Sequence, residues 1–204
     1  MTAPLIHVID DDAALRTALA RLLGVSGYRV QQYESGKAFL DGGSTGEVGC
    51  ILLDVNMPGL TGLQLQEHLA GNGSILPIVF LTGNGDIAMS VRAIKAGAED
   101  FLPKPVQRAT LLDAVERAMA RCQVALAEQV GLADLRQRYR SLTAREHEVF
   151  ALVIQGQLNK QIAYALGNTE RTVKAQRQAV MEKLRAGSVA ELVRMGMLLG
   201  MVPV

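Results

Sequence analysis

Polar residues that could do chemistry stand where short apolar runs end in the first half of the chain. They are Asp10, Asp11 and Asp12 after the run 5–9, Asp54 within the run 50–55, Thr82 at the end of the run 78–82, and Lys104 after the run 100–102. A carboxylate at the tip of a buried strand costs free energy unless it is paired, hydrogen-bonded or bound to a metal ion. These positions therefore predict either helix caps or a chemical site.

The chemistry that fits this set of side chains is phosphoryl transfer onto Asp54. Clustered carboxylates repel one another and need a cation, and their oxygens favour Mg²⁺ or Ca²⁺ over softer metals. An Asp carboxylate can act as a nucleophile toward phosphorus and form an aspartyl phosphate. Lys104 and the hydroxyl of Thr82 could then hold the phosphoryl oxygens. From the residues alone, either Asp10 with Asp11 or Asp11 with Asp12 could form the metal pair.

A parallel sheet is the element arrangement that would position these residues. Short apolar runs alternate with amphipathic helical stretches over the first 105 residues, and this alternation predicts βαβ units. The expected strands are 5–9, 28–33, 50–55, 78–82 and 100–102, and the expected helices are 13–23, 35–40, 62–70, 87–96 and 108–126. In such a sheet the carboxyl ends of all strands lie on one edge, so the polar residues are expected to meet there.

The second half of the chain has a different character. Residues 1–120 contain 9 Lys and Arg against 13 Asp and Glu, whereas residues 121–204 contain 12 against 7. An acidic half joined to a basic half indicates two functions, with a polyanion as the partner of the second. Residues 123–140 read as a helical linker, as one long helix with the preceding stretch or as two helices broken at Gly131.

The last 60 residues read as four short helices that contain a helix-turn-helix. Residues 159–166 predict one helix, Gly167 and Asn168 a tight turn, and residues 169–185 a longer helix. Basic and amide side chains lie on the outer face, at Lys160, Arg171, Lys174, Arg177 and Gln178. An ordinary solvated helix face is the alternative, but the helix-turn-helix pattern favours contacts to DNA phosphates and base edges.

The remaining features of the sequence favour the cytoplasm. Cys50 and Cys122 do not form a disulfide framework. The first residues contain no basic region of a signal peptide, and no segment approaches the roughly 18 apolar residues of a membrane span. No membrane partner is expected.

Four segments of the first half resemble the signature of the two-component receiver domain. They are Val8-Ile9-Asp10-Asp11-Asp12, Leu53-Asp54-Val55-Asn56-Met57-Pro58-Gly59, Thr82-Gly83 and Lys104-Pro105. The resemblance covers residues 5 to about 122, and it implies an α/β flavodoxin-like fold with a five-stranded parallel sheet of order 2-1-3-4-5. The receiver domain would occupy residues 1–122.

The resemblance also implies a role for each acidic residue. Asp54 would be the phosphoacceptor, and Asp10 and Asp11 would hold Mg²⁺ together with Asp54 and the backbone carbonyl of Asn56. Asp10 and Asp11 are preferred as the metal pair because the corresponding pair of the family directly follows the strand. Asp12 would then cap the first helix.

The other residues of the site would act on the phosphoryl group and on the switch. Lys104 would pair with the acceptor or with the phosphoryl group, and the bond between Lys104 and Pro105 would be cis. Thr82 would be the switch hydroxyl, and Phe101 the switch aromatic residue, with a core role as the alternative for Phe101. Asn84 borders the site and would influence hydrolysis of the phosphate.

The basic half resembles the LuxR-type effector domain over residues 141–202. The matching segments are Ser141-Leu142-Thr143-Ala144-Arg145-Glu146, Asn159-Lys160-Gln161-Ile162-Ala163, Thr172-Val173-Lys174 and Lys183-Leu184. A receiver followed by this domain is the architecture of the NarL/FixJ response regulators. The segments 82–86 and 96–105 favour the FixJ branch. The DNA-binding domain, an all-α four-helix unit, would occupy residues 141–204.

By position, the resemblance implies two sets of DNA contacts. Base contacts are expected from Lys174, Ala175 and Gln178. Phosphate contacts are expected from Lys160, Arg171, Thr172 and Arg177. Gln176 departs from the family, which usually has His at this position, so the local backbone contact there is in doubt.

The resemblance thus implies a transcription regulator that is switched by phosphorylation. A sensor histidine kinase would donate the phosphoryl group, and the phosphorylated protein would form a homodimer on double-stranded DNA. The protein would catalyse only its own phosphorylation and dephosphorylation. One alternative is a phosphohydrolase of the haloacid dehalogenase type that uses Asp10 and Asp12. Another is a DNA-binding regulator that works without phosphorylation.

Overall fold

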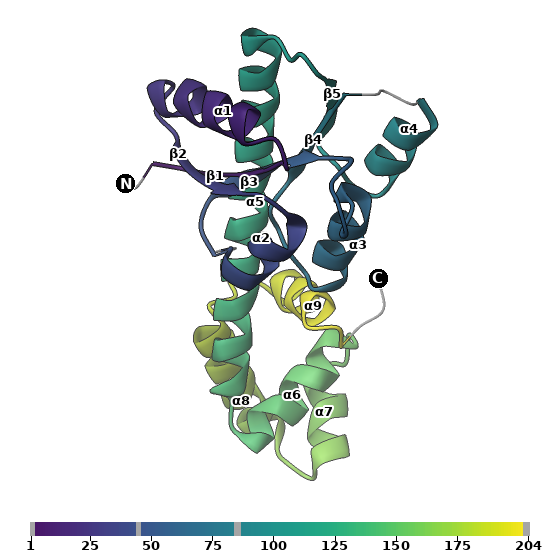
Figure 1. Cartoon of the computed structure of the whole chain (residues 1–204). Coiled ribbons are helices and arrows are strands. Elements are labelled where there is room, and N and C mark those ends of the chain that lie inside the picture. The colour runs from purple at the N-terminus through teal and green to yellow at the C-terminus, as the bar shows by residue number, and fades with distance from the viewer. Residues whose placement is uncertain (1–2, 44–45, 84–86, 202–204) are drawn as a thin grey trace. The chain divides into compact units, whose positions relative to one another are not determined.

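The structure, a computed structural model, describes residues 3–43, 46–83 and 87–201. It divides into two compact units, Met1–Ala127 and Glu128–Val204. Each unit has its own hydrophobic core, so the two are described separately. Figure 1 gives the labels of the elements along the chain.

The first unit is a parallel five-stranded sheet with helices on both faces. Its elements are β1 (Leu5–Ile9), α1 (Ala13–Val25), β2 (Arg29–Tyr33), α2 (Gly36–Gly42), β3 (Gly49–Asp54), α3 (Gly62–Gly71), β4 (Ile78–Thr82), α4 (Ile87–Lys95), β5 (Asp100–Pro103) and the first part of α5 (Arg108–Arg140). All four strand pairs are parallel, and the strand order is β2-β1-β3-β4-β5. The predicted fold and strand order are therefore confirmed.

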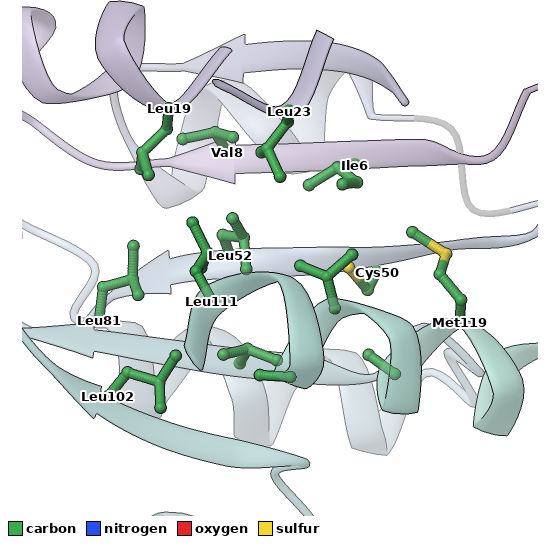
Figure 2. Close-up of a cluster of buried hydrophobic side chains, with 14 residues drawn as sticks. Ile6, Val8, Leu19, Leu23, Cys50, Leu52, Leu81, Leu102, Leu111 and Met119 are labelled. Carbon is green, nitrogen blue, oxygen red and sulfur yellow. The ribbon is translucent and has the colours of Figure 1, made fainter. Parts of the chain in front are cut away.

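The alternation of side chains along the central strands produces the two layers of the core. Ile6 and Val8 of β1 face one cluster together with residues of α1 and α5, whereas Ile9 faces a second cluster with residues of α2 and α3. Figure 2 shows the first cluster, in which Leu23 of α1 and Leu111 of α5 approach the same face of the sheet. Because successive residues of a strand point to opposite faces, a strand covered on both sides is apolar throughout.

Helix α5 is a single helix of 33 residues that contributes to both units. Its first part supplies Leu111 and Met119 to the core of the sheet, and Leu135 belongs to the core of the second unit. The segment 123–140, predicted as a helical linker, is helical without a break at Gly131. The division between the units falls inside this segment, after Ala127.

The second unit consists of the end of α5 and the helices α6 (Ala144–Ile154), α7 (Asn159–Leu166), α8 (Glu170–Leu184) and α9 (Val189–Leu198). Helix α7 ends at Leu166 and is capped by Gly167, which has a φ of 64° in the left-handed region that glycine adopts readily. The hydroxyl of Thr169 then caps α8 by accepting from the Thr172 N–H. Helix α7, the short turn after it and helix α8 together form the predicted helix-turn-helix.

An ion pair ties α6 to α8 in this unit. The carboxylate of Glu146 accepts a hydrogen bond from Lys183 Nζ at 2.7 Å and another from the Thr143 N–H at 2.7 Å. The bond from Lys183, followed by the bond from Thr143, holds the pKa of Glu146 below its usual range. Glu146 is thus both the third residue of a capping box and a link between α6 and α8.

Candidate functional site

A lysine that bridges two buried carboxylates forms the centre of the candidate site. Lys104 Nζ donates to Asp10 Oδ2 and to Asp54 Oδ1, each at 2.6 Å. Asp10 is fully buried, Asp54 is 5% exposed, and the Lys104 side chain is 22% exposed. Residues that are 94 and 50 positions apart in the sequence therefore meet at one point.

The sheet brings these three residues together because they all stand at carboxyl ends of parallel strands. Asp10 directly follows β1, Asp54 is the last residue of β3, and Lys104 follows β5. The backbone N–H of Lys104 donates to the carbonyl of Thr82, the last residue of β4, at 2.7 Å. The bond between Lys104 and Pro105 is cis, as expected.

The two carboxylates are also held by backbone N–H groups. Asp10 Oδ1 accepts from the N–H of Asp12 at 2.9 Å, and Asp54 Oδ2 accepts from the N–H of Asn56 at 3.0 Å. Each carboxylate thus has one oxygen on a backbone donor and one on Lys104, a pattern that fixes its orientation.

The buried side chains of the site carry more carboxylate groups than ammonium groups. Burial lowers the pKa of Lys104, but the hydrogen bonds and charges of Asp10 and Asp54 outweigh this effect, and the pKa is raised above its ordinary value. Lys104 is therefore an ammonium ion at neutral pH. One ammonium faces two carboxylates, and the exposed Asp11 is the next residue after Asp10.

These donors fit a magnesium ion by their chemistry. The available ligands are oxygen atoms, and Mg²⁺ is commonly held by one or two carboxylates while it keeps several waters. Asp10 and Asp54 would supply those carboxylates, and a divalent cation would offset the excess negative charge. The fit rests on two carboxylates, since within residues 3–43, 46–83 and 87–201 no group of three or more His, Cys, Asp or Glu side chains lies close enough together to hold a metal ion.

The three consecutive acids have different surroundings. Asp11 is exposed, whereas Asp10 is buried against Lys104. Asp12 caps helix α1, because its Oδ1 accepts from the N–H groups of Ala14 and Leu15. The expectation that Asp12 is a helix cap is therefore confirmed.

The predicted switch residues lie on neighbouring strands. Thr82 is 1% exposed at the end of β4. Phe101 of β5 is half-buried, packs against the second core cluster, and has its ring centroid 5.9 Å from that of Phe80. Asn84, expected to border the site, lies outside the described residues.

Most of the predicted DNA-contacting residues are exposed on α7 and α8. The exposed ones are Lys160, Arg171, Thr172, Lys174, Ala175 and Gln178. Arg177 differs, because it is half-buried and donates to Asn159 Oδ1 at 2.9 Å, which links α8 to the start of α7. Gln176 is also half-buried, and its Oε1 has no hydrogen-bond partner among the described residues.

Two residues beside the cluster at the carboxyl end of the sheet were not predicted from the sequence. Arg16 of α1 donates from its guanidinium to the backbone carbonyl of Asp10 at 2.6 Å. Gly62 begins α3 directly against β3, where an added Cβ would lie 2.3 Å from the carbonyl oxygen of Asp54. A basic residue soon after the Asp12 cap, and a glycine next to the Thr61 cap, were the available signals.

Comparisons with known proteins identify both units. Residues 6–116 match the response regulator receiver domain, and residues 140–196 match the bacterial regulatory proteins of the luxR family. The chain is 42% identical over 198 residues to the transcriptional regulatory protein FixJ of Azorhizobium caulinodans, which covers 97% of this chain and 94% of that protein. It is 43% identical over 189 residues to the tetrathionate response regulatory protein TtrR of Salmonella typhimurium, with coverage of 93% and 90%.

A solved structure supports the same assignment. The response regulator StyR is similar with a TM-score of 0.81 at 42% identity, and the match covers 96% of this chain and 98% of StyR. In the described part of this chain, every helix is too short or too polar to cross a membrane. With both units matched in the same order as in full-length relatives, the chain belongs to the FixJ-like response regulators of two-component systems, transcription regulators that join a receiver domain to a LuxR-type DNA-binding domain.

Proposed function

We propose that Asp54 accepts a phosphoryl group from the phosphohistidine of a sensor histidine kinase and that this event controls DNA binding. The observation that carries the proposal is the bridge from Lys104 to Asp10 and Asp54 at 2.6 Å. A carboxylate oxygen of Asp54 attacks phosphorus and forms the O–P bond. The P–N bond breaks, and its electron pair returns to the imidazole nitrogen of the kinase.

The neighbours of Asp54 would stabilise the transferred charge. Lys104 holds an oxygen of the acceptor before transfer and is near enough to hold a phosphoryl oxygen afterwards. Asp10, Asp11 and the backbone carbonyl of Asn56, with Asp54, would hold Mg²⁺. When bound, Mg²⁺ supplies positive charge to the phosphoryl oxygens. The two buried carboxylates that share one ammonium support the roles of Asp10 and Asp54 in this ligand set, whereas Asp11 and Asn56 are assigned by the resemblance alone.

The same site would act as a conformational switch. Thr82 would bond a phosphoryl oxygen through its hydroxyl, and Phe101 would rotate toward the space that Thr82 leaves. Phe101 is half-buried at the edge of the core, a position from which a ring can be either packed or exposed. A change of this kind alters the surface of α4 and β5, which would favour a homodimer of the phosphorylated protein.

The output would be sequence-specific binding to double-stranded DNA by α8. Lys174, Ala175 and Gln178 would contact base edges, and Lys160, Arg171, Thr172 and Arg177 would contact phosphates. Arg177 would make its phosphate contact while it also orients α7 through Asn159. The protein would work in the cytoplasm, where its DNA lies, and it would catalyse only its own phosphorylation and dephosphorylation.

Labelling with acetyl phosphate tests the proposal. The full-length chain is incubated with acetyl phosphate and Mg²⁺, and intact mass spectrometry measures the gain of one phosphoryl group. We expect labelling of the wild type and of Asp41→Asn, an exposed acid on α2, but none of Asp54→Asn. Size-exclusion chromatography and selection of DNA fragments, with and without beryllofluoride, then measure dimerisation and DNA binding.

The labelling result also separates the alternatives. Equal labelling of Asp54→Asn and the wild type would refute the acceptor assignment. Failure to label the wild type would favour a regulator that works without phosphorylation. A phosphohydrolase that uses Asp10 and Asp12 is not supported, because the Asp12 carboxylate is engaged as the cap of α1.

A further inference from the structure

Asp10 has a hydrogen-bond partner on each of its polar atoms. Its N–H donates to the carbonyl of Tyr33 at 3.2 Å, and its two carboxylate oxygens accept from the Asp12 N–H and from Lys104. The remaining atom, the backbone carbonyl, accepts from Arg16 at 2.6 Å. Of these partners, Arg16 is the one whose side chain comes from a helix on the face of the sheet rather than from a strand end.

We propose that Arg16 is a positioning residue for the metal and phosphorylation site: its guanidinium holds the Asp10 carbonyl and thereby fixes the direction in which Asp10 presents its carboxylate. The inference rests on the proposed function, because it assigns to Asp10 the role of a Mg²⁺ ligand. Arg16 stands at the second turn of α1, where its own N–H donates to the Asp12 carbonyl at 3.0 Å. The segment 10–12 is thus held at its first residue by the Arg16 side chain and at its last by the Arg16 backbone, and only the first of these bonds depends on the arginine.

Two effects of Arg16 on Mg²⁺ binding oppose each other. Its positive charge near the acid cluster repels a cation and so weakens binding. Its hydrogen bond orders a ligand and so strengthens binding, as partners that orient metal ligands commonly do by ten- to a hundredfold. Arg16 is half-buried, so water and salt screen the repulsion between its charge and a bound cation. They weaken the direct 2.6 Å hydrogen bond to the Asp10 carbonyl less. We therefore expect the ordering effect to dominate.

Mg²⁺ titration of full-length variants, without a phosphodonor, tests the inference by isothermal calorimetry. Arg16→Met removes both charge and donor, and we expect about tenfold weaker Mg²⁺ binding. Arg16→Lys keeps a cationic donor, so its affinity should fall between that of Arg16→Met and the wild type. Arg21→Met, an exposed arginine on the same helix, should bind Mg²⁺ as the wild type does.

Acetyl phosphate labelling gives a second readout that damage to the fold would not mimic. We expect Arg16→Met to need about tenfold more Mg²⁺ for half-maximal rate but to approach the wild-type rate at saturating Mg²⁺. Circular dichroism checks that each variant is folded, and if Arg16→Met is not, Arg16→Lys alone carries the comparison. Tighter Mg²⁺ binding by either Arg16 variant, or binding by Arg16→Met equal to that of the wild type, would overturn the inference and leave the function of Asp54 intact. A wild type that does not bind Mg²⁺ would overturn both the proposed metal site and this inference.

Discussion

Replacing Lys104 by Met should destabilise the receiver unit strongly when Mg²⁺ is absent. Lys104 is the side-chain cation that faces both Asp10 and Asp54, and both of these residues are at least 95% buried. Removing one partner of a buried ion pair typically costs about 3–5 kcal/mol, because it leaves uncompensated charge in the interior. Since the Lys104 side chain is itself 22% exposed, we expect the lower end of that range, about 3 kcal/mol.

Hydrogen exchange of the β3 amides measures this change within the full chain. Peptides that cover residues 49–54 are followed by mass spectrometry in the presence of a chelator that removes Mg²⁺. Because these residues form β3, the measured free energy of opening is that of the receiver unit and not that of the helical unit. A loss of about 3 kcal/mol corresponds to roughly a hundredfold faster exchange. Saturating Mg²⁺ should recover part of the loss, because a ligand that binds the folded state stabilises it.

The Asp54→Asn background supplies the control. With one carboxylate neutralised, Lys104→Met leaves only Asp10 unpaired, and its cost should fall to roughly half. Exchange that accelerates less than about threefold in the single variant, or by the same factor in both backgrounds, would contradict the reasoning. Either result would mean that Lys104 does not compensate the two carboxylates jointly.

Further predictions concern the metal pair, the helical unit and DNA. Asp12→Ala should cost about 1 kcal/mol of stability through loss of the α1 cap, measured by urea unfolding, and should leave Mg²⁺ affinity unchanged. Asp11→Asn should weaken Mg²⁺ binding, measured by calorimetry. Because the pKa of Glu146 is lowered in the folded state, its contribution to stability is present above its unfolded pKa and is lost as pH falls through its folded pKa. Glu146→Gln should therefore lower the melting temperature at neutral pH and reduce the loss of stability below about pH 4, in thermal unfolding followed by circular dichroism. Lys160→Ala should weaken DNA binding at all sequences and reduce the slope of log affinity against log salt by about 1, measured by fluorescence anisotropy. Replacing the exposed Arg194 of α9 by Ala is the matched control, which should leave both quantities unchanged.

The meeting of Asp54 and Lys104 could be predicted from the sequence because it follows from topology alone. Residues at the carboxyl ends of parallel strands share one edge of the sheet, whatever their separation along the chain. The strand boundaries needed for this argument agree with the structure to within one residue, since apolar runs mark buried strands clearly. The individual contacts between these polar residues were harder to predict. That Lys104 bonds Asp10 as well as Asp54 depends on how far its side chain reaches.

Other features depend on contacts that leave no periodic signal. The bond from Arg16 to the Asp10 carbonyl joins a helix residue to a strand end and has no characteristic spacing. The continuity of α5 through Gly131 could not be decided either, because a glycine costs a helix only about 1 kcal/mol and the flanking helix-forming residues offset that cost. The half-burial of Arg177 arises from its contact with Asn159, a residue of the neighbouring helix.

The complete pairing of Asp10 bears on attempts to transplant this site into another protein. Its partners come from the end of β2 at Tyr33, from the loop at Asp12, from helix α1 at Arg16 and from the residue after β5 at Lys104. A designer who copied only the acids and the lysine onto a different parallel sheet would leave two backbone groups of this aspartate to be satisfied by chance. The smallest transferable unit is therefore a strand-loop-helix segment together with the end of the neighbouring strand β2 and the end of the more distant strand β5.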